Sequence, residues 1–414
     1  MSKQQLSERL CAWIDQHFDE EVGVLQQLIR IPTDTPPGNN APHADAVAEL
    51  VQSWGWQAEK HAVPADQVRD YGMQSITNLI VRRPYGDGGP TLALNAHGDV
   101  VPPGEGWTHD PYGGEVADGR IYGRAAAVSK SDFASYIFAT RALESLGAAL
   151  RGAVELHFTY DEEFGGVLGP GWLLEQKLTR PDYVLAAGFS YNVVTAHNAC
   201  LQFEVTVHGR ATHGSMPETG HDALQAANAI LNAIYGALPG LKDIRSSIPG
   251  ISHPTMIVGR IDGGTNTNVV PGKVVLKMDR RMIPEEDPAQ VEAGVRKLIE
   301  DAVAGLPGIR VEIRRLLLAR ALRPLPGHEK LVDSLLRNAE QVMGETLTTN
   351  GSALYTDARL YGEAGIPVVL FGAGPRTLME SNAKQADENL ALDDLKKATK
   401  VVALMLLDFL GPQD

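Results

Sequence analysis

Residues 92–99 read LALNAHGD, a run of apolar residues that leads into a His-Gly-Asp triplet. The apolar part is typical of a buried strand, so the triplet falls where that strand stops. A second apolar run, residues 153–160, leads into the acidic triplet Asp-Glu-Glu at 161–163. Active sites of open α/β sheets lie at the carboxyl ends of strands. A histidine and several acids at such an edge are typical of a hydrolytic zinc site.

The composition limits the class of protein. A chain of 414 residues favours two domains. The formal net charge of −14 argues against nucleic acid or an anionic membrane as a partner. The sequence contains no apolar stretch that could span a bilayer and no signal-peptide pattern at its start. Its two cysteines, Cys11 and Cys200, form no disulfide framework. We therefore expect a cytoplasmic protein that binds neither nucleic acid nor a membrane.

Helical and strand patterns alternate along the first part of the chain and again near its end. This alternation indicates an α/β domain, a mixed sheet with helices on both faces. The expected helices are 6–31, 44–54, 132–146, 172–176, 329–343 and 392–410, and the expected strands are 78–82, 91–96, 153–160, 183–187 and 367–371.

A different pattern separates the two parts. Residues 201–316 read strand, helix, strand, strand, helix, strand, which is the order of a ferredoxin-like unit. We therefore expect a discontinuous catalytic domain, residues 1–198 and 319–414, with an inserted lid or dimerisation domain at 199–318. The strand at 201–208 is expected to lie at a sheet edge and to form the seam of a homodimer.

Several motifs carry a resemblance to a known family. They are AHGDVVP at 96–102, YGR at 122–124, DEEFGG at 161–166, GRATH at 209–213, NVVP at 268–271, DRR at 279–281 and YTDA at 355–358. Together they resemble the two-zinc hydrolases of the aminoacylase, acetylornithine deacetylase, succinyl-diaminopimelate desuccinylase and glutamate carboxypeptidase family. The motifs span almost the whole chain in the family's order.

The resemblance implies a set of site residues. His97 and Glu163 correspond to zinc ligands, and Asp99 to the residue that orients the histidine. Glu162 corresponds to the general base. The bridging aspartate position, however, falls on Val128, a further acidic ligand falls near Gly188, and the last histidine ligand falls on Lys384. Two ligands of five remain, fewer than the three protein ligands of a catalytic zinc ion.

These departures lead to a hypothesis in which lysines replace the metal. Buried acids without a cation are costly, and Lys130 and Lys384 would supply the charge. One ion pair at contact contributes about 4 kcal/mol at an effective dielectric constant near 20. Glu162 alone would then activate water. The alternative is a hydroxyl nucleophile, Ser129 or Ser131, beside a lysine; helix capping is the simpler role for both serines.

Three further residues are implied by the resemblance. His213 corresponds to a lid histidine that reaches the partner subunit's site and stabilises the tetrahedral intermediate. Asn268 and Arg281 correspond to residues that bind the substrate's carboxylate, for which an arginine fork is suited. A purely structural salt bridge is the competing interpretation of Arg281.

The preferred function is hydrolysis of an amide bond in a small N-acyl amino acid or peptide-like substrate, with a reduced or absent metal requirement. One alternative keeps zinc and recruits Asp99, Asp132 or His197 as ligands. Two others are a non-hydrolytic proton-transfer enzyme, and a catalytically inactive homologue that binds a ligand or a partner.

Overall fold

The computed structural model describes residues 1–412 and divides the chain into two compact units. Unit 1 comprises residues 1–195, 324–349 and the residues from 356 onward, and unit 2 comprises residues 196–323 and 350–355. The short segment 350–355 therefore belongs to unit 2, although its sequence placed it in the resumed α/β pattern. Among residues 1–412, none of the helices combines the length and apolarity that crossing a bilayer requires.

Unit 1 is built on a mixed sheet, which belongs to an eight-stranded order β1-β2-β6-β3-β7-β16-β8-β15. In this order β8 from residue 196 and β15 from residue 350 are counted in unit 2. The strands are β1 (Ala58–Ala62), β2 (Thr77–Pro84), β3 (Thr91–His97), β6 (Ala153–Thr159), β7 (Tyr183–Ala186), β8 (Val193–His197), β15 (Thr349–Ser352) and β16 (Val368–Leu370). A small sheet, β17-β5-β4, joins β4 (Glu115–Ala117), β5 (Arg120–Tyr122) and β17 (Asn389–Ala391).

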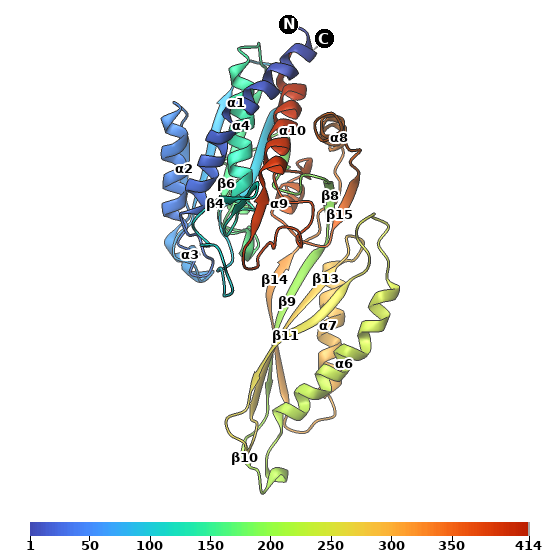
Figure 1. Cartoon of the computed structure of the whole chain (residues 1–414). Coiled ribbons are helices and arrows are strands. Elements are labelled where there is room, and N and C mark those ends of the chain that lie inside the picture. Colours follow the sequence, from blue (N-terminus) through green and yellow to red (C-terminus); the bar gives the residue numbers. More distant parts are fainter. Residues whose placement is uncertain (413–414) are drawn as a thin grey trace. The chain divides into compact units, whose positions relative to one another are not determined.

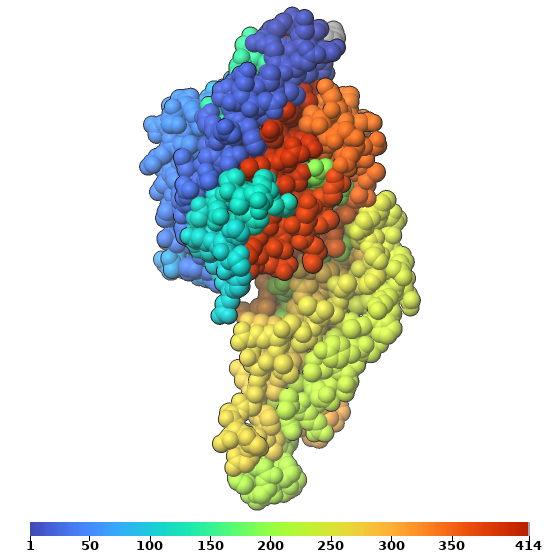
Figure 2. Space-filling view, viewed as in Figure 1, coloured from blue at the N-terminus to red at the C-terminus, as the bar shows by residue number. Residues whose placement is uncertain are grey.

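Helices cover this sheet. They are α1 (Lys3–Ile29), α2 (Ala41–Ser53), α3 (Ala65–Asp70), α4 (Lys130–Ser145), α5 (Pro170–Glu175), α8 (Glu329–Met343), α9 (Ala358–Glu363) and α10 (Leu392–Leu410). The long helices α1, α4 and α10 pack side by side, with α4 against β3 and β6 (Figure 1). Figure 2 shows α1, in blue, beside α10, in red, on the outside of unit 1. Helix α4 is buried on nearly all sides, which explains its weak amphipathic pattern.

The parallel pairing of β3 with β6 positions the site. Residues 91–97 of β3 run in register beside residues 153–159 of β6, so that His97 lies opposite Thr159. The histidine of one motif and the acids that follow β6 therefore meet at one edge of the sheet. β7 lies parallel to β3 on its other side. This is the arrangement that the two apolar runs predict.

Unit 2 has a four-stranded antiparallel sheet in the order β11-β13-β9-β14, with two helices on one face. The elements are β9 (Ala199–His208), α6 (Ala223–Asp243), β11 (Thr255–Gly263), β13 (Lys273–Met282), α7 (Pro288–Val303) and β14 (Arg310–Ala319). This is the strand order of a ferredoxin-like unit, and it confirms the expected α/β fold with its insert. A two-stranded sheet pairs β10 (Thr212–His213) with β12 (Val269–Val270).

The prediction that the strand at 201–208 lies at a sheet edge is wrong. β9 pairs with β13 on one side and with β14 on the other, so it lies inside the sheet. Its clean alternation of buried and half-buried residues reflects a sheet with one covered face. Alternation reports which face is buried and carries no information about lateral neighbours. The edges of this sheet are β11 and β14.

Candidate active site

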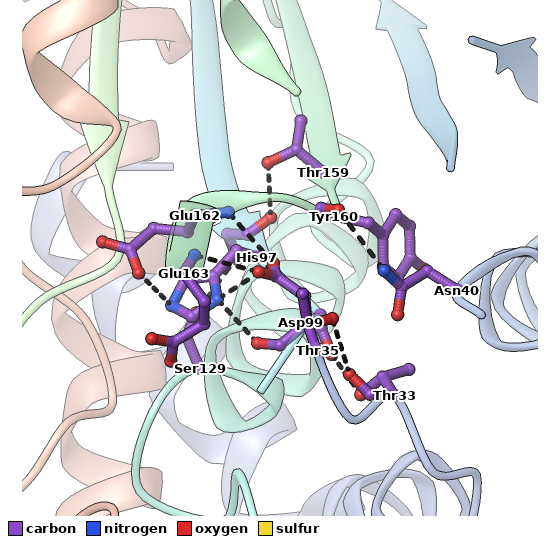
Figure 3. A network of polar contacts seen from close by, with 12 residues as sticks. Thr33, Thr35, Asn40, His97, Asp99, Ser129, Thr159, Tyr160, Glu162 and Glu163 are labelled. Carbon is purple, nitrogen blue, oxygen red and sulfur yellow. Dashed lines mark hydrogen bonds and ion pairs between the residues drawn. The ribbon is translucent and has the colours of Figure 1, made fainter. Parts of the chain in front are cut away.

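His97, Asp99, Glu162 and Glu163 form one polar network at the carboxyl ends of β3 and β6, in which His97 and Asp99 are buried and the two glutamates are half-buried (Figure 3). His97 Nδ1 lies 3.0 Å from the Asp99 carbonyl and 3.4 Å from Asp99 Oδ1. His97 Nε2 faces Glu162 Oε2 at 3.9 Å. Asp99 accepts the backbone amides of Glu162 at 3.2 Å and Glu163 at 3.0 Å. Asp99 therefore orients the histidine and also fixes the turn that carries both glutamates.

The charges in this network are strongly coupled. Burial lowers the pKa of His97, but Glu162, Asp99 and Glu163 outweigh it and raise the pKa to about 10. The imidazole is therefore a cation at neutral pH. Burial also raises the pKa of Glu162 to about 6, with His97 and Lys384 opposing the shift and Glu163 and Asp99 adding to it. A carboxylate with a pKa near neutrality is suited to general acid–base catalysis.

Lys384 joins the network from a distant segment. Its Nζ donates to Glu163 Oε2 at 2.7 Å, and half of the lysine side chain remains exposed. Burial lowers the pKa of Lys384, but Glu163 and Glu162 outweigh it and raise the pKa above its ordinary value. The ammonium group is therefore charged, and it forms an ion pair with Glu163, the carboxylate that the resemblance identifies as a zinc ligand.

Two acids hold the loop that carries Lys384. Glu388, which is buried, accepts the Lys384 amide at 3.2 Å and the Ala127 amide at 3.1 Å, and pairs with Arg124 at 2.5 Å. Asp387 accepts the amides of residues 108 and 109 at 2.8 and 3.0 Å. The sequence analysis used these two acids only to locate position 384. The structure shows them to be the anchors of its backbone.

The structure adds two buried acids that the sequence analysis did not assign. Asp161 and Asp357 lie in the quoted motifs DEEFGG and YTDA, and both have raised pKa values. Burial is the main cause in each case, the Asp99 and Glu162 carboxylates add to the rise in pKa of both groups, and Asp161 adds to the rise in pKa of Asp357. Within residues 1–412, Asp161 Oδ1 and Asp357 Oδ2 have no hydrogen-bond partner. The sequence did offer a signal for both aspartates, because each lies in a motif that carries the family resemblance.

Lys130 forms its hydrogen bonds with backbone carbonyls and not with the acids of this network. Its Nζ donates to the carbonyls of Leu28 at 3.0 Å and Ile31 at 2.8 Å, at the end of α1. Burial lowers its pKa to about 7, although Asp34, Glu388 and Asp99 oppose the shift. Its hydrogen bonds join α4 to α1 and reach none of the site carboxylates. We therefore leave Lys130 out of the chemistry proposed below.

The two serines before and within α4 are buried. Ser129 precedes the helix but makes no capping hydrogen bond with its side chain. Its hydroxyl instead accepts the His97 amide at 3.4 Å. Ser131 Oγ has no hydrogen-bond partner within the described chain. This burial favours Glu162 over a serine hydroxyl as the group that starts the reaction.

The donors at this site do not fit a two-zinc centre. Valine at position 128 has no lone pair, and Gly188 has no room for a side chain, because a Cβ there would lie 2.9 Å from the Phe371 amide nitrogen. Lys384 contributes an ammonium group. Among residues 1–412, no group of three or more His, Cys, Asp and Glu side chains is arranged to hold a metal ion.

The candidates for recruited ligands are engaged elsewhere. Both oxygens of Asp99 accept backbone amides, and Asp132 Oδ1 accepts the Ala373 amide at 2.7 Å. His197 belongs to unit 2, where its Nδ1 lies 2.9 Å from the Asn198 carbonyl.

The three remaining candidates, His213, Asn268 and Arg281, all belong to unit 2, and two of them lie close together. His213 on β10 is exposed, with Nδ1 2.7 Å from Ser215 Oγ. The Gly214 amide donates to the Asn268 carbonyl at 2.7 Å, which holds the two segments side by side. Arg281 lies eight residues beyond Lys273 on β13, about 27 Å along the strand at ~3.4 Å per residue. Arg281 is therefore at the other end of β13.

Comparisons with known proteins identify the family of this chain. The sequence profile described as Peptidase family M20/M25/M40 matches residues 93–408. Two succinyl-diaminopimelate desuccinylases are similar: that of Methylobacterium radiotolerans is 28% identical, and that of Rhodospirillum centenum is 29% identical. Each alignment covers 94% of this chain and 96% of the relative.

Solved structures share the fold. Human carnosine dipeptidase 1 superimposes with a TM-score of 0.78 at 19% identity, covering 98% of each chain. An M20 family metallo-carboxypeptidase from Sulfolobus solfataricus gives a TM-score of 0.77 at 20% identity, covering 94% of this chain and 98% of that one.

Proposed function

Because the chain belongs to peptidase family M20/M25/M40 and is an enzyme of its amidohydrolase type, we propose that it hydrolyses a small N-acyl amino acid or peptide-like amide with a reduced or absent metal requirement. The observation that carries this proposal is the 2.7 Å ion pair between Lys384 and Glu163. It puts a charged amine beside the acids of the site, where three of the five zinc donors that the resemblance implies are missing.

In the proposed reaction, Glu162 takes a proton from a water molecule as the water oxygen attacks the amide carbonyl carbon. Negative charge then develops on the carbonyl oxygen, and Lys384 and the protonated His97 are the nearby cations that oppose it. Glu162 returns the proton to the amide nitrogen as the C–N bond breaks. The products are a carboxylic acid and an amine, so the atoms of water and amide are all accounted for.

The substrate class follows from the relatives and from unit 2. Two relatives are named succinyl-diaminopimelate desuccinylases, so N-succinyl amino acids are the first compounds to test. Arg281 is proposed to bind the substrate's carboxylate. Because His213 and Asn268 lie together at the other end of β13, they are proposed to act at the site of the partner subunit, where Asn268 binds the carboxylate and His213 stabilises the tetrahedral intermediate. The enzyme is proposed to act in the cytoplasm, where its free thiols, Cys11 and Cys200, would stay reduced.

A panel of N-succinyl, N-acetyl and N-benzoyl amino acids tests the function, with release of free amine as the readout. The purified chain should hydrolyse at least one class, and Glu162→Gln should lower kcat by about 100-fold or more. Glu20→Gln is the matched control, because Glu20 lies in an outer ion pair with Arg141 at 2.7 Å. No turnover of any panel member, with intact ligand binding, would favour the inactive binding homologue. Product isomers without free amine would favour proton transfer.

We also propose a homodimer that forms through unit 2. Since β9 lies inside its sheet, the unpaired strand edges available to a partner are those of β11 and β14. On β11, Ile257 is 56% exposed and Ile261 is 50% exposed. Light scattering should give twice the mass of the 44.6 kDa chain, and Ile257→Lys should shift the mass toward one chain. A single-chain mass for the unmodified protein would exclude the dimer.

A further inference from the structure

Two adjacent arginines on β13 have different environments. Arg280 is buried on the helix-covered face, where its Nη2 donates to Glu286 at 2.6 Å and its Nη1 donates to a backbone carbonyl. Arg281 points to the other face and keeps 29% of its side chain exposed. Its Nε donates to Asp279 Oδ1 at 2.8 Å. Within residues 1–412, its two Nη atoms donate no hydrogen bond. Arg280 is therefore the structural arginine, and Arg281 has an unused donor fork.

Asp279 is itself held in place from two strands. Its Oδ2 accepts Gln202 Nε2 at 3.0 Å and lies 3.4 Å from the Cys200 thiol. The sheet register explains this, because Asp279 lies opposite Gln202, and Arg281 lies opposite Cys200. Burial raises the pKa of Asp279, but hydrogen bonds from Arg281 and Gln202 outweigh burial and hold this pKa below its ordinary value. Both carboxylate oxygens are thus engaged, and the aspartate cannot turn away.

A ring fixes the guanidinium from a second direction. The Arg281 guanidinium carbon lies 5.3 Å from the centroid of the Tyr355 ring, which also belongs to unit 2. An arginine held at Nε and against a ring loses little side-chain entropy when its Nη pair binds a planar anion. The ion pair with Asp279 is formally neutral, so it offers directed donors with little net charge.

We propose that Asp279 is a positioning residue, which with Gln202 and Tyr355 aims the two Nη donors of Arg281 at the free carboxylate of the substrate. The inference deepens the proposed function and rests on it for the identity of the anion. It predicts selection for a carboxylate over the carboxamide of the same shape, because the amide nitrogen would point a donor at the fork. Cys200 serves only as a buried donor to Asp279, and burial raises the pKa of its thiol to about 12.

The chain offers a matched control for the test. On the neighbouring strand β11, Arg260 Nε donates to Asp262 Oδ2 at 2.6 Å, the same Asp and Arg pairing over two residues but fully in solvent. Asp279→Asn and Asp262→Asn remove the same charge from equivalent pairs. Each variant is assayed with the best N-acyl amino acid of the panel and with its carboxamide.

For Asp279→Asn we expect KM for the free acid to rise about tenfold or more, with kcat within about threefold and KM for the carboxamide unchanged. Asp262→Asn should behave like the unmodified enzyme. If Asp279→Asn melts early, Gln202→Ala should give a smaller rise, about threefold, with the same selectivity. Equal losses on acid and amide, or no change, would overturn the inference.

A binding measurement separates this inference from the proposed function. Calorimetric titrations in the Glu162→Gln background use N-acetylglycine, N-succinylglycine and hippurate, each against its carboxamide. Preference for the acids that Asp279→Asn abolishes supports the positioning role even if the enzyme hydrolyses none of them. Hydrolysis of the panel without a carboxylate preference in either assay contradicts the positioning role and leaves the proposed function intact.

Discussion

Lys384 is the residue on which the proposed chemistry depends. Its ammonium group lowers the pKa of Glu162 and sits on Glu163. Replacing it by methionine removes this charge while keeping an unbranched side chain. We expect Lys384→Met to reduce kcat/KM by about 100-fold or more, because charge stabilisation in a buried site contributes several kcal/mol. The pH at which Glu162 titrates should also rise, which the acidic limb of the pH–rate profile reports.

Lys60→Met is the matched control for this measurement. Lys60 also pairs with a carboxylate, Asp45, at 2.8 Å, but both side chains are about half exposed. Exposed pairs contribute little, so its activity and pH profile should stay unchanged. Wild-type turnover in Lys384→Met would show that the amine plays no part in the reaction.

Glu21 allows a test of a buried acid away from the site. It lies among α1, α4 and α10, where Thr399 donates to Oε1 at 2.6 Å and Oε2 has no partner within the described residues. Burial raises its pKa to about 8, although Thr399 and Lys396 oppose the shift. The folded state therefore binds this proton more tightly than the unfolded state, where the pKa is about 4.5. Stability from this group is fully present below pH 4.5 and is lost as the pH rises toward 8.

Glu21→Gln should remove this loss of stability at high pH, because a glutamine side chain does not ionise. We expect the variant to melt at a higher temperature than the unmodified chain at pH 8, and at nearly the same temperature at pH 5. Glu20→Gln, next in sequence but in an outer ion pair, should show no such pH-dependent gain. A gain for Glu21→Gln that is equal at both pH values would mean that ionisation of Glu21 is not the cause.

The two lysines mark the limit of prediction at the residue scale. Lys130 and Lys384 both follow from the positions of family motifs, and the sequence gives them equal weight. The structure separates them because of distant chain segments: the end of α1 supplies two carbonyls to Lys130, whereas Glu388 and Asp387 hold the Lys384 backbone at the site. Such tertiary contacts have no local signature.

At the scale of elements, the turn from Glu162 to Gly166 decides where both glutamates point. Gly166 has φ +74°, and a Cβ there would lie 1.9 Å from Asp357 Oδ1. Gly166→Ala should therefore displace Asp357 or the turn and lower both activity and melting temperature. Gly147 is the matched control, with φ +59° and no heavy atom within 4 Å of a Cβ. Gly147→Ala should show only the backbone cost, about 1 kcal/mol, with unchanged kcat. Equal effects of the two substitutions would contradict a steric role for Gly166.

The long elements were predictable, and so were some short ones, such as β7 and β16, whereas other short elements were not. The helices near 6–31 and 392–410 have apolar residues at helical spacing, and the structure forms α1 and α10 there. β1 reads AEKHA, with no buried residue, and exists because it pairs with β2. β9 was assigned to the right residues but to the wrong place in its sheet, since lateral order depends on the helical connections between strands.

At the scale of the whole molecule, motif order and element order agreed on the fold, and the departures from the family pattern concentrate at one site. A sequence whose local preferences conflict with the expected chemistry only at a functional site points to altered chemistry there. The residues flanking Val128 support this, because the Ala127 amide donates to Glu388 and the Ser129 hydroxyl accepts the His97 amide. Position 128 therefore still lies within the site, although its side chain offers no metal donor.

This placement predicts how metal removal affects the whole enzyme. A ligand that binds only the folded state stabilises it by about 2.7 kcal/mol at one hundred times its Kd, so a bound zinc ion would raise the melting temperature. For the unmodified chain, purified without chelator, we expect less than one zinc per chain and no change in activity or melting temperature with EDTA. The double variant Val128→Asp with Lys384→His supplies two missing donors, and zinc should raise its melting temperature by a few degrees. Two zinc ions per unmodified chain, with activity that EDTA abolishes and zinc restores, would show that the enzyme keeps its metal and that Lys384 does not replace it.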